Sequence, residues 1–267
     1  MQTLTEIGVA DVKTVYDGAE GDLWELVMGE QIHIGGMTAS MDLAERAEIA
    51  PGSAGVDLCC CSGAGMRFLV RFRDVAHMTG VDMTERVVGR GRLRNRAEGF
   101  TKRIDFVVAE VTASGLGDAF ADFIWGEDGW CYVPDKKLLV REAARIVKPG
   151  GTISFTDWLA GPKPMSPQES ERFLRFMKFP NILTLAEYAS LLEDAGCNVV
   201  VARDTERFAP HVDLYLNMLG MQLTYDALKV IGFDMELMQV LGGEMTFIQE
   251  LAHAGKISQG QLVARRR

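Results

Sequence analysis

Acidic and aromatic residues come directly after an apolar run near the middle of the 267-residue chain. The run spans 121–125 and leads into Gly126-Glu127-Asp128-Gly129-Trp130-Cys131-Tyr132. If the run is a buried strand, these side chains gather at its carboxyl end, where open α/β sheets bind ligands. Carboxylates and aromatic ring faces both attract positive charge. The cluster therefore suits a cationic or amine substrate, with Asp128 or Glu127 stabilising a forming cation.

A second candidate site is the stretch from Gly55 to Gly65, Gly-Val-Asp-Leu-Cys-Cys-Cys-Ser-Gly-Ala-Gly. A short apolar run leads into small residues, and residues 66–72 can open a helix. Such a corner brings free backbone N–H groups close to a ligand. Asp82 comes after the next apolar segment, 75–81, and is placed to accept hydrogen bonds from ribose hydroxyls. The dinucleotide pattern G-x-G-x-x-G lacks its third glycine here, which disfavours an NAD-dependent oxidoreductase.

His33 is the third candidate, in the glycine-rich segment Gly29-Glu30-Gln31-Ile32-His33-Ile34-Gly35-Gly36. If the reacting atom of the substrate is an amine nitrogen, the amine needs only to be in its neutral form. An oxygen or carbon nucleophile needs a general base instead, and His33 is the candidate for that role. The structural alternative is a buried, hydrogen-bonded histidine.

Apolar runs and amphipathic segments alternate along the chain, which indicates an α/β fold. Strands are expected at 55–58, 75–81, 104–109, 121–125, 152–158 and 197–204. Helices are expected at 38–50, 66–74, 84–98, 136–147, 169–179 and 184–195. The helix 84–98 carries five arginines, and we expect a solvated face that contacts water or acidic residues. Residues 211–257 are expected to be helical.

These motifs resemble the class I methyltransferases that use S-adenosylmethionine (SAM). The stretch 56–65 stands where that family has its G-x-G-x-G loop, with Cys59 and Cys61 at the first two glycine positions. Lys148-Pro149-Gly150-Gly151, between a helix and a strand, is a second signature. Segments 15–36 and 125–132 resemble the cap and the Trp-x-x-Asp-x-aromatic run of sarcosine and dimethylglycine methyltransferases. The cap also resembles that of the tocopherol type.

The resemblance implies a Rossmann-like seven-stranded sheet whose last strand, 259–267, is antiparallel. It implies a helical N-terminal cap (1–50), a SAM-binding core (51–208) and a helical lid insertion (209–258). The residues implied to bind SAM are Asp57, Cys59, Ser62, Gly63, Asp82, Met83, Glu110, Val111 and Glu127. The implied catalytic residues are Tyr16, His33 and Asp128, and the substrate residues are Trp24, Trp130, Tyr132 and Trp158. Alternatives are Trp24 docked on the sheet, Trp125 alone in the core, and Glu110 as a plain strand-end carboxylate.

Composition narrows the partners. The net charge of -9 and pI near 5.1 argue against nucleic acid and anionic membranes. The five cysteines are odd in number and form no spaced framework, so reduced thiols and a cytoplasmic location are expected. Consecutive strand residues point to opposite faces, so Cys59–Cys61 predict no metal site. No signal peptide and no membrane span of roughly 18 residues are visible; a homodimer stays open.

The sequence and the resemblance therefore predict methyl transfer from SAM to a small molecule, with an amine as the favoured acceptor in an N-methylation like that of sarcosine or dimethylglycine. A methionine-rich insertion favours O- or C-methylation of an apolar molecule instead, although helix packing also explains those methionines. The two cysteines in glycine positions motivate a third hypothesis, a SAM-binding protein without catalysis.

Overall fold

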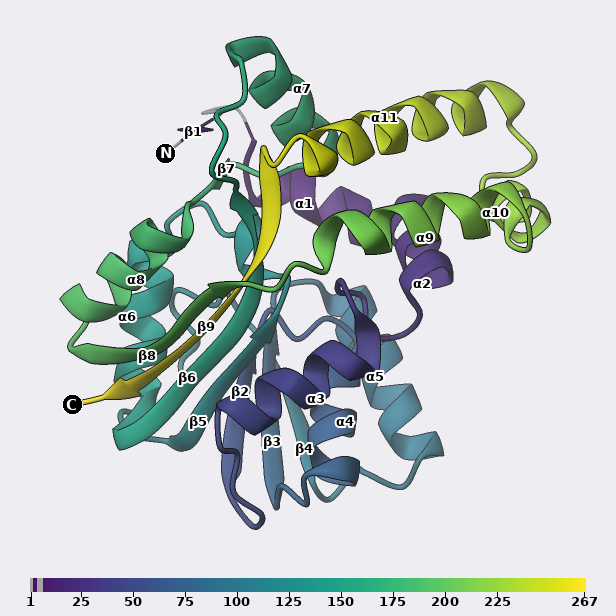
Figure 1. Cartoon of the computed structure of the whole chain (residues 1–267). Helices are drawn as coiled ribbons and strands as arrows, with labels where there is room; N and C mark the ends of the chain where they lie inside the picture. The colour runs from purple at the N-terminus through teal and green to yellow at the C-terminus, as the bar shows by residue number, and fades with distance from the viewer. Residues whose placement is uncertain (1, 4–6) are drawn as a thin grey trace.

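The computed structural model describes residues 2–3 and 7–267, and a single mixed sheet forms its centre (Figure 1). The strand order is β4-β3-β2-β5-β6-β9-β8. Neighbouring strands from β4 to β6 are parallel, and β9 runs antiparallel to both β6 and β8. The strands are β2 (Ala54–Leu58), β3 (His77–Asp82), β4 (Ile104–Val108), β5 (Ala121–Glu127), β6 (Val147–Ala160), β8 (Cys197–Asp204) and β9 (Ile257–Arg266). The predicted Rossmann-like sheet with an antiparallel last strand is confirmed.

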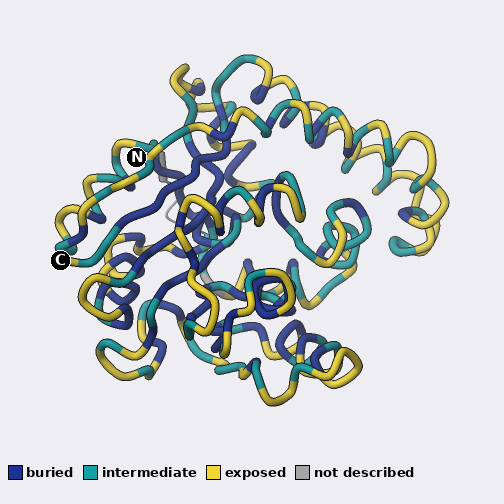
Figure 2. Tube along the Cα trace, turned by 60° about the horizontal axis from the view of Figure 1, so that its bottom comes forward, coloured by how far each residue is buried: buried dark blue, intermediate teal, exposed yellow. Residues whose placement is uncertain are grey.

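Helices cover both faces of this sheet because its strands carry apolar side chains on both sides. One face is covered by α6 (Lys136–Ile146) and α8 (Leu185–Asp194), the other by α3 (Gly36–Arg46), α4 (Ala64–Phe72) and α5 (Glu85–Ala97) (Figure 1). Two cores lie between the sheet and these helices. Along β5, Ile124 packs into the first core, beneath α6 and α8, whereas Phe123 and Trp125 pack into the second core, beneath α3 and α4. Trp125 is fully buried, as expected for a core residue. Figure 2 shows the buried stretches concentrated along the sheet.

A third core lies beyond the carboxyl edge of the parallel strands. It joins α2 (Ala19–Met28) and α7 (Pro167–Met177) to α9 (Phe208–Gly220) and α11 (Met235–His253), with α1 (Val9–Tyr16) and α10 (Thr224–Val230) beside them (Figure 1). A short pair of strands, β1 (Gln2–Thr3) and β7 (Asn181–Ile182), lies at its border.

Among the individually predicted strands and helices, two differ from the expected bounds by more than two residues. The helix predicted at 38–50 begins at Gly36 and ends at Arg46, because Gly35 takes the left-handed conformation that starts it (φ 95°). The strand predicted at 152–158 extends back to Val147, since the Lys-Pro-Gly-Gly turn stays in the strand.

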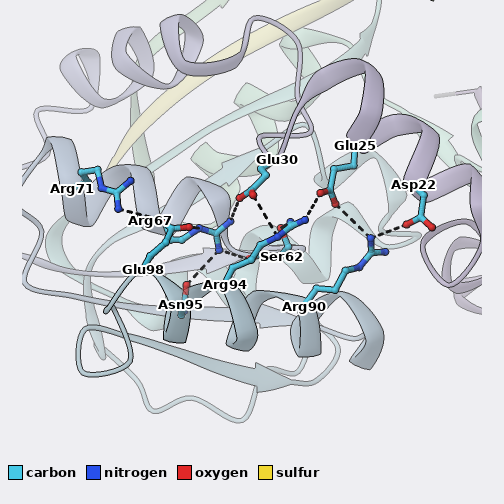
Figure 3. Close-up of polar contacts among 10 residues, drawn as sticks. All are labelled: Asp22, Glu25, Glu30, Ser62, Arg67, Arg71, Arg90, Arg94, Asn95 and Glu98. Atoms are coloured by element: carbon cyan, nitrogen blue, oxygen red, sulfur yellow. Dashed lines mark hydrogen bonds and ion pairs between the residues drawn. The ribbon is translucent and has the colours of Figure 1, made fainter. Parts of the chain in front are cut away.

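The arginine helix α5 binds the cap. Arg90 Nη1 lies 2.7 Å from Asp22 Oδ1, and Arg94 pairs with Glu25 (Figure 3). Arg67, on α4, extends the row with a 2.7 Å contact to Glu30 Oε2. The expectation that this helix contacts acidic residues is confirmed, and the acids come from α2 and the turn after it.

Within the described ranges, no helix has the length and apolar character needed to cross a bilayer. The N-terminal pattern used to predict the absence of a signal peptide includes residues 1 and 4–6, which lie outside those ranges.

Candidate active site

A pocket of about 270 Å³ opens at the carboxyl ends of β2, β3, β4 and β5. Parallel strands present these ends at one edge of the sheet, so residues distant in sequence converge there. The lining consists of Val12, Tyr16, Ile32, Cys59, Cys61, Asp82, Met83, Thr84, Val87, Glu110, Val111, Thr112, Glu127, Asp128, Gly129, Tyr132, Val133, Pro134 and Asp135. Six of the nine predicted cofactor residues lie in this lining: Cys59, Asp82, Met83, Glu110, Val111 and Glu127.

The turn after β2 takes a backbone conformation that glycine would adopt without strain. Cys59 has φ 65° and Cys61 has φ 48°, each at a cost on the order of 1 kcal/mol or more for a residue with a side chain. Space for the Cys59 side chain exists because Gly129 lies opposite, where an added Cβ would come within 2.8 Å of Cys59 Cβ. The two cysteines therefore stand in a conformation that suits glycine, and both residues line the pocket.

Asp82 is held at the end of β3 by two backbone donors. Its Oδ1 accepts from Thr84 N and its Oδ2 from Cys61 N, each at 2.9 Å. The Thr84 hydroxyl also hydrogen-bonds to this carboxylate, which leaves about one of its roughly four acceptor positions for a ligand. Asp82 can therefore still accept a hydrogen bond from a ligand in the pocket.

Asp57 is a buried acid whose carboxylate has no hydrogen-bond partner among the described residues. Burial raises its pKa well above the usual range, and the carboxylates of Glu127 and Asp82 add to the effect. An added Cβ at Gly65 would lie 2.7 Å from Glu127 Oε2 and 3.5 Å from Asp57 Oδ2. The bare glycine therefore leaves an acidic cradle that a cation would complete.

His33 acts on the pocket through Glu127. Ser40 Oγ donates to Glu127 Oε1 at 2.6 Å and lies 3.1 Å from His33 Nε2, which is itself 3.3 Å from Glu127 Oε1. The imidazole is buried and does not line the pocket. This geometry favours a positioning role for His33 over direct contact with an acceptor.

Asp128 lines the pocket, but its carboxylate is engaged inside the protein. Oδ2 accepts from Ile34 N at 2.8 Å, and Gln259 Nε2 lies 2.9 Å from Oδ1 and 2.8 Å from Oδ2. Burial raises the pKa of Asp128. These bonds tie the cap turn to β5 and β9, which favours a structural role over the predicted catalytic one.

Tyr16 and Tyr132 meet across the pocket. Tyr16 Oη donates to Tyr132 Oη at 3.1 Å, and the rings lie edge to face, 5.6 Å apart. Burial raises the pKa of both phenols. They therefore remain protonated near neutral pH and serve as hydrogen-bonding groups rather than bases.

Three predicted substrate tryptophans lie outside this pocket. Trp130 is fully buried and stacks on Phe155 at 3.9 Å. It comes after a glycine turn and folds back over β6, which a linear pattern does not reveal. Trp158 packs against Phe208 in the third core. Trp24 lines a separate cavity.

Two predicted cofactor residues also lie behind the pocket wall. Ser62 is buried, and its Oγ accepts from Arg94 Nη1 at 3.0 Å. At Gly63 (φ 77°) an added Cβ would meet Phe106 and Met66 at 2.7 and 2.8 Å. Both residues shape the turn, and neither lines the pocket. The insertion 209–258, predicted as a substrate lid, contributes no residue to the described lining.

The two acidic features described above, the carboxylates beside Gly65 and the carboxylate of Asp82, suit S-adenosylmethionine. Asp57, which has no hydrogen-bond partner of its own among the described residues, would hold the ammonium group of the cofactor beside Gly65, and Asp82 would accept from its ribose hydroxyls. Met83 and Val111 would flank the adenine base.

Comparison with known proteins agrees with this geometry. A family model described as a methyltransferase domain matches residues 56–155. Phosphoethanolamine N-methyltransferase 1 of Arabidopsis thaliana is 28% identical over 187 residues, which cover 69% of this chain. Residues 56–155 therefore form a SAM-dependent methyltransferase domain, and the sheet order described above is that of class I. The match spans only 37% of the Arabidopsis enzyme. A second relative, 27-O-demethylrifamycin SV methyltransferase of Amycolatopsis mediterranei, is 28% identical over 72% of this chain and 75% of its own length.

The fold of this methyltransferase is shared with phosphoethanolamine N-methyltransferase 2 of Haemonchus contortus. That structure contains phosphomonomethylethanolamine and S-adenosylhomocysteine. The TM-score is 0.84 at 16% identity, over 95% of this chain and 58% of the other.

Sequence patterns do not reveal Ser40 and Gln259, which position Glu127 and Asp128. Ser40 lies in a helix, Gln259 lies in the last strand, and neither belongs to a motif. The loop motif includes Cys61 without assigning its thiol to the pocket. The available signal was that Cys61 occupies a position where the loop motif usually has glycine.

Proposed function

We propose that this methyltransferase transfers the methyl group of SAM to a small amine that carries no phosphate or carboxylate. The observation that carries the proposal is the charge of the pocket. Five carboxylates lie in its lining, and no lysine, arginine or histidine does so among the described residues. An acidic substituent on the acceptor would find no cationic partner there, and burying it unpaired would be costly.

Bound SAM supplies an electrophilic methyl group on a positively charged sulfur. The residues of the chain then hold the cofactor, orient the acceptor and exclude water. Val12 and Ile32 from the cap contribute apolar surface that keeps water out of the pocket. The hydroxyls of Tyr16 and Tyr132 are placed to orient the acceptor.

Glu127 is the residue we assign to the charge that develops on the acceptor. Its carboxylate faces the pocket and is oriented by Ser40 and His33. A carboxylate held ready for a forming ammonium stabilises the transition state more than the neutral amine. With a primary or secondary amine, the same group can accept the proton that nitrogen releases.

The named relatives support two different acceptor classes. The phosphoethanolamine N-methyltransferases support an amine, but a phosphate has no basic partner in this pocket. The rifamycin relative supports the second candidate, O-methylation of an apolar molecule, which the apolar lining also favours.

Calorimetry with S-adenosylhomocysteine, followed by a methyl-release assay, tests the proposal. The acceptors are alkyl and hydroxyalkyl amines, phosphoethanolamine and sarcosine, and apolar alcohols. We expect turnover with the first group alone. We also expect Glu127→Gln to lower amine turnover at least about tenfold, with Glu45→Gln, which changes an exposed carboxylate outside the pocket, as the control.

Each other outcome overturns the proposal. Faster turnover of phosphoethanolamine or sarcosine contradicts the charge argument, and turnover of alcohols alone supports O-methylation. Cofactor binding without any turnover supports a non-catalytic SAM-binding protein.

A further inference from the structure

A second cavity, of about 430 Å³, lies between α2 and the insertion helices α9, α10 and α11. It is larger than the pocket at the sheet edge and shares no lining residue with it. Its volume falls within the range of about 300–1,000 Å³ that is usual for small-molecule sites. The inference drawn from it does not depend on the proposed acceptor.

The wall of this cavity is apolar except at one carboxylate. Trp24, Phe176, Leu216 and Met245 are among its lining residues. The two threonines in the lining are satisfied internally, since Thr224 Oγ1 donates to Leu219 O and Thr246 Oγ1 to Gly242 O.

The remaining polar group is Glu20. Among the described residues its carboxylate has no hydrogen bond or ion pair, although the charge of Lys178 acts on it. Glu20 is half-buried, and this burial raises its pKa, with the charge of Lys178 acting in the opposite direction. A cation inside the cavity would offset the cost of this burial.

Two exposed glycines lie at the mouth of the cavity. Gly220 and Gly242 both line it, and an added Cβ at either would meet nothing within 4 Å. Gly242 lies in the interior of α11, where glycine destabilises a helix by about 1 kcal/mol relative to alanine. A larger side chain at Gly242 would therefore be tolerated by the helix and would project at the mouth of the cavity.

We propose that this cavity is a second ligand site, which binds an apolar molecule bearing one amino group. The hydrocarbon part would lie against Trp24, Leu216 and Met245, and the ammonium would pair with Glu20. The ligand occupies a space distinct from the one that holds the cofactor, so the two can be bound together.

Dodecylamine, dodecanol and dodecanoate, each below its micelle concentration, are suitable probes. Trp24 reports binding by fluorescence, because the other three tryptophans are buried; Trp24→Phe identifies its contribution. We expect dodecylamine to bind at least about tenfold more tightly than dodecanoate, and Glu20→Lys to reverse that order.

Gly242→Leu and Gly243→Leu form a matched pair. Both add the same side chain to α11 at positions with open space, but only Gly242 lines the cavity. We expect the first to weaken dodecylamine binding at least about tenfold and the second to leave it unchanged. Affinity for S-adenosylhomocysteine should be unaffected in both, which separates this test from that of the proposed function.

The inference is overturned if the wild-type chain binds none of the three probes. It is also overturned if the two leucine variants behave alike, or if Glu20→Lys leaves the preference for the amine intact.

Discussion

Replacing Asp128 with asparagine distinguishes a structural clamp from a catalytic carboxylate. The change keeps the shape of the side chain and replaces one acceptor oxygen with an NH₂ donor. In the wild-type chain both oxygens accept, from Ile34 N and from Gln259 Nε2, at 2.8–2.9 Å. The new NH₂ group would therefore face another donor whichever way it turns.

Gln259 has little freedom to adapt. Turning its amide would take Oε1 away from Thr205 Oγ1, which donates to it at 2.8 Å. One charge-assisted hydrogen bond contributes about 1.5–3 kcal/mol. Part of this loss is offset because the amide relieves the buried charge that raises the pKa of Asp128. We expect the free energy of unfolding to fall by about 2 kcal/mol, a Tm decrease of about 4–8 °C.

Thermal unfolding and calorimetry with S-adenosylhomocysteine measure the effect. We expect affinity to fall together with stability, because the clamp holds the cap turn that carries Ile32 and His33. Glu45→Gln is the control, since that exposed carboxylate lies outside the pocket and makes no hydrogen bond among the described residues. If Asp128→Asn keeps wild-type stability and cofactor affinity but loses methyl transfer, the residue is catalytic and our reasoning is wrong.

Three further perturbations test other parts of the structure. Cys61→Val should lower the free energy of unfolding by about 1–2 kcal/mol, because a β-branched residue fits φ 48° poorly, whereas Cys61→Gly should preserve cofactor affinity; equal Tm values for the two variants would contradict this. Arg94→Gln removes two ion pairs, one with Glu25 and one with Glu30, worth about 0.2–1 kcal/mol each, so cofactor affinity should fall severalfold and become less sensitive to salt, as a calorimetric salt titration would show. Burial raises the pKa of Asp157 to about 7, from an ordinary value of 3.8; the folded state therefore holds this proton more tightly, and wild-type stability should fall relative to Asp157→Asn as pH rises from 4 to 7. Parallel stability curves over that range would refute the assignment.

Sequence patterns predicted best where chain direction alone determines location. Asp82, Met83 and Glu127 each end a parallel strand or come directly after one, so identifying the strands placed them at one edge. The arginine helix was likewise predicted to meet acids, although the sequence did not say that they belong to the cap. Such patterns do not predict the direction of a side chain after a turn. Trp130 was predicted in the pocket for this reason, but it packs into the core.

The sequence by itself determined which acids end which strand, and that cysteines occupy glycine positions in the loop. These are local properties, set by apolar periodicity and backbone conformation. Only the tertiary structure decided that Gln259, 131 residues away, binds Asp128, and that His33 reaches the pocket through Ser40 and Glu127. Those roles depend on which donors come within about 3 Å of an acceptor, and packing between distant segments sets that distance.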